Sequence, residues 1–82
     1  MMVTYDLSTP ASVSIEVLNI AGRSVRKLVQ SRPASTGTNE QMWDMRSTDG
    51  TLVPNGSYLI RLEAVAENGQ RVQALRPAQI TR

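Results

Sequence analysis

The chain has 82 residues, a net charge of +2, and neither cysteine nor histidine. This length predicts one small domain. The two missing residue types exclude disulfides, thiolate chemistry, and the commonest general base and metal ligand, so we expect no catalytic site and no cofactor. The nine basic residues are dispersed among acidic ones and only three residues are aromatic, so we expect no nucleic-acid partner. No apolar run approaches the roughly 20 residues that a membrane span needs.

Apolar residues at every second position predict β-strands in the first part of the chain. The first strand is expected over residues 3–7 and the second over residues 13–17. Leu18 and Ile20 then fall out of phase with the preceding strand. A phase slip of one residue indicates a bulge or a strand that changes sheet.

The next segments predict a hairpin turn, an edge strand and a loop. Gly22 is expected to supply the positive φ of a short turn. Residues 25–28 place an arginine and a lysine between two apolar residues, which is typical of a strand at the edge of a sheet. Residues 31–38 are rich in Ser, Thr, Pro and Gly and predict a loop. Glu40, Met42 and Trp43 predict a fourth strand.

The C-terminal part shows the clearest alternation, over residues 58–64. Asn68-Gly69 predicts a type I′ hairpin turn that joins this strand to residues 72–75. Pro77 restricts the last strand to a sheet edge or requires a bulge, and Ile80 predicts a final pairing. The total of about seven short strands predicts an all-β fold, an Ig-like or fibronectin type III-like antiparallel β-sandwich.

Two aromatic residues flank the central loop region of the chain. We expect Trp43 to be buried between the sheets. The alternative is an exposed residue that stacks on a glycan, which usually needs further coplanar aromatic residues. Tyr58 follows a tight turn, so its ring should pack inward and its hydroxyl should reach a backbone group, as in a tyrosine corner. No base stands near Tyr58 in the sequence to support a catalytic role.

Asp44 and Asp49 bracket the loop between these aromatic residues. We interpret both carboxylates as acceptors of backbone N–H groups that fix turns. They remain candidates for calcium, but their spacing fits no established calcium loop and the ion requires about six to eight oxygen ligands. A glycosidase acid–base pair would need a cleft, for which 82 residues offer little room. Gly50 and Gly56 occupy turn positions after an aspartate and an asparagine.

Several of these motifs together, in this order, carry a family resemblance. They are VTYDL at residues 3–7, the Gly22 hairpin within residues 13–28, Trp43-Asp44, Asp49-Gly50, and VPNGSY at residues 53–58. This set resembles the FlgD-like Ig-like domain, found in the flagellar hook-capping protein and near the C-termini of large secreted bacterial proteins. Met45 stands where that family often has glycine, and Asn19 where it often has aspartate. Sorting domains of type IX secretion are similar in the hairpin but usually lack the Trp-Asp pair.

The resemblance implies that residues 1–82 form a single domain excised from the C-terminal part of a larger protein. It also implies fold-defining roles for Gly22, Trp43, Asp44, Asp49, Gly50, Gly56 and Tyr58. We expect a non-catalytic structural or assembly module of an extracellular, cell-surface or flagellar bacterial protein. Its partners would be other domains of the parent chain or assembly proteins. The alternatives are a C-terminal sorting or anchoring domain and an accessory glycan- or calcium-binding module, and the sequence does not fix the oligomeric state.

Overall fold

The computed structural model describes all residues 1–82 and contains only β-strands, turns and loops. The structure has no helix that could cross a membrane. Its six strands are β1 (Met2–Leu7), β2 (Ala11–Asn19), β3 (Ser24–Ala34), β4 (Gly37–Met42), β5 (Gly56–Ala66) and β6 (Arg71–Ile80).

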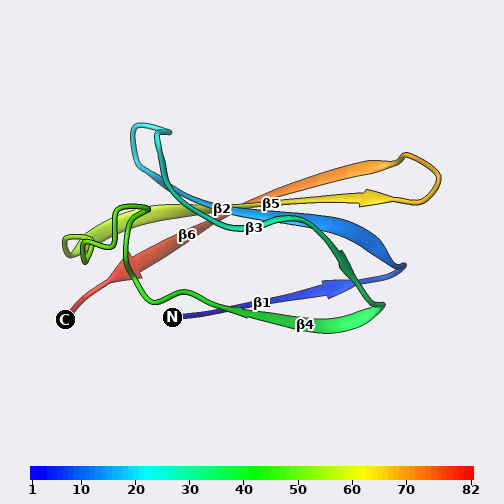
Figure 1. Cartoon of the computed structure of the whole chain (residues 1–82), viewed down its shortest axis with the longest axis horizontal. Helices are drawn as coiled ribbons and strands as arrows, with labels where there is room; N and C mark the ends of the chain where they lie inside the picture. Colours follow the sequence, from blue (N-terminus) through cyan, green and yellow to red (C-terminus); the bar gives the residue numbers. More distant parts are fainter.

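The strands form two antiparallel sheets that face each other as a sandwich (Figure 1). One sheet has two strands in the order β1-β4, and the other has four strands in the order β3-β2-β5-β6. The predicted fold class is therefore confirmed. The predicted edge position of the strand around residues 25–28 is also confirmed, because β3 lies at the end of its sheet.

The predicted count of about seven strands is wrong, since the structure has six. The separate pairing expected at Ile80 belongs to β6, which continues through Pro77 without a register shift against β5. β6 is an edge strand, so the proline nitrogen can face away from β5 and no ladder hydrogen bond is lost. Of the two alternatives for Pro77, the structure shows the edge position.

The predicted loop over residues 31–38 is mostly strand. β3 runs to Ala34 and β4 begins at Gly37, so only Ser35 and Thr36 connect them. Residues 30–33 are polar or proline and solvent-exposed. An exposed edge strand has no buried face to impose apolar alternation, which is why its composition resembles that of a loop.

The phase slip at Leu18 is not a bulge in β2 itself, because the irregularity at this point lies in the neighbouring strand β3. Val17 and Leu18 are both buried although they are consecutive. Val17 pairs with Arg26 and Leu18 pairs with Ser24, so β3 contains an extra residue at this point, while the pairing of β2 with β5 stays regular. This is one of three register shifts between β2 and β3, and such bulges twist this edge away from regular pairing.

The hairpin at Asn68-Gly69 exists, but its turn is not type I′. A type I′ turn needs positive φ at both central residues, and only Gly69, at 85°, has it. The Gly69 amide donates to the Ala66 carbonyl at 2.9 Å, and the Ala66 amide donates to the Gln70 carbonyl at 2.8 Å. This is a three-residue loop, a type I turn followed by a left-handed glycine, in which the Asn68 side chain accepts from the Gln70 amide at 3.0 Å.

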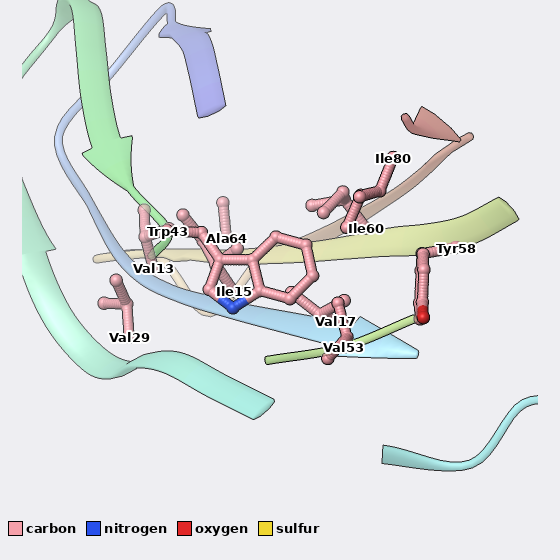
Figure 2. Packing of buried hydrophobic residues seen from close by; sticks show 10 residues of the cluster. All are labelled: Val13, Ile15, Val17, Val29, Trp43, Val53, Tyr58, Ile60, Ala64 and Ile80. Carbon is pink, nitrogen blue, oxygen red and sulfur yellow. The ribbon is translucent and has the colours of Figure 1, made fainter. Parts of the chain in front are cut away.

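The core lies between the sheets, around Trp43 (Figure 2). Figure 2 shows the indole among aliphatic side chains of β2 and β5, with Tyr58 and Val53 beside it. The buried cluster consists of Val13, Ile15, Val17, Val29, Trp43, Val53, Tyr58, Ile60, Ala64 and Ile80. No polar or charged residue is buried. The core is therefore apolar, and its largest member comes from the segment that follows β4.

Candidate functional site

Residues 43–58, here called the Trp–Tyr block, link the two-stranded sheet to β5. Trp43 has an exposed fraction of 0%. Its indole Nε1 donates to the Arg46 carbonyl at 3.0 Å, and its backbone amide donates to the Met1 carbonyl at 2.7 Å. The predicted burial of Trp43 is confirmed. A ring without exposed surface has no face on which a sugar could stack.

Tyr58 packs against Trp43 and closes the other end of the block. The two rings meet edge to face, with centroids 6.1 Å apart and planes at 71°, an arrangement that aromatic pairs prefer. The Tyr58 ring is buried, and its hydroxyl donates to the Pro54 carbonyl at 2.6 Å. Figure 2 shows this hydroxyl pointing away from the centre of the cluster. The geometry is that of a tyrosine corner, as predicted.

Between the aromatic residues the chain forms a miniature hairpin. Arg46 and Leu52 form an isolated antiparallel bridge. The Ser47 amide donates to the Thr51 carbonyl, and the Gly50 amide donates to the Ser47 carbonyl, both at 2.9 Å. Gly50 has a φ of 87°, a conformation that glycine adopts without steric cost. The Asp49-Gly50 turn thus has the same three-residue form as the hairpin around Gly69.

Both aspartates of the block accept backbone N–H groups. Asp44 Oδ1 accepts from the Arg46 amide at 3.1 Å and from an Arg26 guanidinium nitrogen at 3.0 Å. Asp49 Oδ1 accepts from the Thr51 amide at 3.0 Å and from the Ser47 hydroxyl. The Ser47 hydroxyl, and then the Thr51 groups, hold the pKa of Asp49 below its usual value of 3.8, because both bonds favour the carboxylate form.

The same geometry limits what the aspartates offer to a metal ion. The structure contains no group of three or more His, Cys, Asp or Glu side chains placed to hold an ion. A hollow of about 640 Å³ borders the block, and Asp49 supplies its only carboxylate. Calcium requires about six to eight oxygens, so the arrangement matches turn capping better than ion binding.

Long-range contacts that the sequence did not indicate tie the block to β3. Thr48 donates to the Val25 carbonyl through its amide at 3.1 Å and through its hydroxyl at 3.2 Å. Arg26 reaches the Arg46 carbonyl at 3.1 Å in addition to Asp44. These partners are about 20 residues apart along the chain, and no local pattern links them.

The remaining predicted positions lie apart from these contacts. Gly22, with a φ of 83°, belongs to the β2–β3 hairpin, where Asn19 Oδ1 accepts from the backbone amides of Ala21 and Arg23 at 3.0 and 2.9 Å. An aspartate at position 19, as the family often has, could accept the same two bonds. Gly56 opens β5 with a φ of 147°.

The fold and the block together define a class of protein: a small Ig-like β-sandwich module whose distinctive residues bond inward to its own backbone. The family model of the FlgD Ig-like domain matches residues 1–70. The chain therefore belongs to the FlgD Ig-like domain family.

Two curated relatives support this family assignment. The basal-body rod modification proteins FlgD of Salmonella typhimurium and Salmonella typhi are each 37% identical to this chain over 75 residues. The alignment covers 90% of this chain but 31% of each relative, so the chain spans about a third of their length. A solved structure of FlgD from P. aeruginosa superposes with a TM-score of 0.75 at 22% identity, over 96% of this chain and 62% of that chain. This likeness supports the fold.

Proposed function

We propose that the chain is a non-catalytic assembly module of a flagellar protein, acting outside the cell as part of a hook-capping or rod-modifying machine. The observation that carries this proposal is its similarity to FlgD proteins, at 37% identity over 90% of the chain. The internal bonding of the Trp–Tyr block supports it, because the residues that define the family are used to build the fold. The matches found are to FlgD proteins, and no observation favours the sorting or glycan-binding alternatives.

In this proposal residues 1–82 are one domain from the C-terminal part of a longer protein. The partners are other domains of that protein or further components of the flagellum. Gly22, Trp43, Asp44, Asp49, Gly50, Gly56 and Tyr58 have structural roles. The domain works as a rigid body that presents sheet faces and strand edges in fixed positions.

The test is an in-frame chromosomal deletion of residues 1–82 in the organism that carries the gene. We expect loss of swimming in soft agar and malformed or missing hooks in electron micrographs. Restoring the segment should restore both, whereas restoring it with Trp43→Ala should impair both, because that variant loses about 3–5 kcal/mol of folding stability. Motile cells with normal hooks after the deletion would refute the flagellar role.

A second arm tests the absence of a metal site. Thermal unfolding of the purified domain should give the same midpoint with added calcium and with EDTA. A ligand that binds only the folded state raises the midpoint by mass action, so an upward shift with calcium would contradict the absence of a metal site.

A further inference from the structure

The two sheets have four strand edges, and three of them carry features that discourage pairing with a further strand. β3 is bulged against β2 and contains Pro33. β6 contains Pro77 and two arginines. On β4 the side-chain amide of Gln41 donates to the Met42 carbonyl at 2.9 Å. Bulges, prolines, charges and occupied carbonyls are the usual means by which natural proteins protect sheet edges.

β1 has no bulge, no proline and no cation, and its one charge, on Asp6, accepts a hydrogen bond from the Thr38 hydroxyl of β4 at 2.6 Å. It pairs with β4 in unbroken register. Met1 and Trp43 exchange both backbone hydrogen bonds at 2.7 Å, so the hydrogen-bonded pairs fall on the odd-numbered residues of this strand. The backbone groups of Thr4 and Asp6 therefore point to the free side, and no backbone bond outside the sheets involves them.

The free edge of β1 borders an apolar groove of about 670 Å³. The half-buried side chains of β1 form one wall, and the inner face of β5 and β6 forms the floor. Val72 lies on this floor opposite Ala64, yet 63% of Val72 is exposed. The two-stranded sheet is too narrow to cover the four-stranded one. The lining includes Val3, Tyr5, Leu7, Leu62, Val72 and Ala74.

One arginine side chain contributes to the lining of the groove. This residue, Arg76, pairs with Ile60 in the register of β5 and β6, and takes part in none of the three ion pairs of the domain. Its guanidinium makes one hydrogen bond, at 3.4 Å to the Leu75 carbonyl. Arg76 is thus available to pair with a carboxylate of a bound ligand.

We propose that the free edge of β1 and this groove bind an extended strand of a separate polypeptide. That strand carries small apolar side chains at alternate positions and one aspartate or glutamate facing Arg76. Backbone bonds to Thr4 and Asp6 would supply affinity, and the groove and the arginine would supply specificity, as in other cases of strand addition. The inference goes beyond the assembly role, because it does not depend on which assembly the domain serves.

A second copy of this chain fits the chemistry less well. The side chains of β1 that would enter the partner's groove are those of Val3, Tyr5 and Leu7, whereas its one carboxylate, on Asp6, is on the exposed face. A symmetric pair of β1 strands would therefore leave Arg76 without an acidic partner in each copy. The charge of the groove favours a foreign strand with its own inward-facing acid.

The test is an NMR titration of the ¹⁵N-labelled domain with a blocked synthetic peptide of about nine residues, a usual strand length. The peptide alternates valine with threonine, has one inward glutamate placed to face Arg76, and has terminal lysines for solubility. We expect saturable binding with a dissociation constant of about 1 mM or tighter. The Thr4 and Asp6 amides should shift and exchange more slowly with solvent. The same peptide with N-methylated edge amides should not bind.

Variants of β6 separate the parts of the proposal. Val72→Lys places a charge on the groove floor and should weaken binding by about tenfold or more. Arg76→Glu should reverse the preference between the glutamate peptide and its lysine counterpart. Leu75→Lys is the matched control, because Leu75 is half-exposed on the opposite face of the same strand, and it should leave binding unchanged. Far-UV circular dichroism establishes that each variant is folded.

Three results would overturn the proposal. They are unchanged Thr4 and Asp6 amides at saturating peptide, equal binding to the Val72→Lys variant, and a dimer in solution whose Thr4 and Asp6 amides are already protected. The last would assign the edge to a second copy. Each of these results leaves the flagellar role intact, because the deletion experiment tests that role separately.

Discussion

Replacing Trp43 by alanine tests whether the Trp–Tyr block determines the stability of the fold. Truncating a fully buried aromatic side chain costs about 3–5 kcal/mol, and Trp43 has an exposed fraction of 0%. The lost bond from Nε1 adds little, because the Arg46 carbonyl still accepts from Arg26. The expected loss is therefore about 3–5 kcal/mol. A domain of 82 residues has about 4–12 kcal/mol in total, so Trp43→Ala should be mostly or wholly unfolded if the domain lies near the lower bound.

The assay is urea unfolding at 25 °C followed by far-UV circular dichroism, since the variant has no tryptophan. Met42→Ala is the matched control. Met42 is the preceding residue and 57% of it is exposed, so the free energy of unfolding of this variant should change by less than about 0.5 kcal/mol. The native protein should also show blue-shifted tryptophan emission. A loss below about 1 kcal/mol for Trp43→Ala would refute the central position of the indole in the core.

Three smaller perturbations test separate contacts of the block. Tyr58→Phe removes one partly buried hydrogen bond, to the Pro54 carbonyl, so it should cost about 1 kcal/mol and lower the melting temperature by about 4–8 °C; no shift in calorimetry would show that the tyrosine corner contributes nothing. A Cβ at position 50 would meet open space, so only backbone strain at the φ of 87° opposes Gly50→Ala. The free energy of unfolding, measured with urea, should fall by about 1 kcal/mol. An unchanged value would contradict the left-handed turn. The pKa of Asp49 is lowered below 3.8 in the folded state, so its carboxylate contributes stability that is present above that pH and lost as the pH falls through the lowered folded pKa. Asp49→Asn should therefore be less stable than the native chain at pH 7 and approach it at strongly acidic pH, and parallel stability–pH curves would contradict this.

Local alternation predicted the strands that have one buried face. Val13 to Val17 and Tyr58 to Ala64 pack one side against the core, so the period of two is visible in the sequence. The full lengths of β3 and β6 were not predictable in this way. Their outer parts are exposed, and only pairing with β2 and β5 keeps residues such as Pro33 and Pro77 in an extended conformation.

The contacts within the Trp–Tyr block were partly predictable. Asp49 caps its turn through Thr51, two residues away, and such local bonds follow from residue type and spacing. Arg26 and Thr48 reach across the sandwich to partners that lie 18–23 residues away. No spacing rule connects residues on different strands until the register is known, and here the bulge in β3 sets that register.

Met45 shows how packing overrides a local rule in this block. Its φ of 61° is a conformation that costs a residue with a Cβ about 1–2 kcal/mol, which accounts for the glycine that the family often has there. The Met45 carbonyl accepts from the Val53 amide at 2.9 Å, so the backbone must keep this conformation to close the miniature hairpin. The methionine side chain is partly buried against the core, and burying such a side chain fully contributes about 1.5–3 kcal/mol. Partial burial contributes part of this amount and so offsets some of the strain, which is why methionine is tolerated in a conformation that glycine adopts more readily.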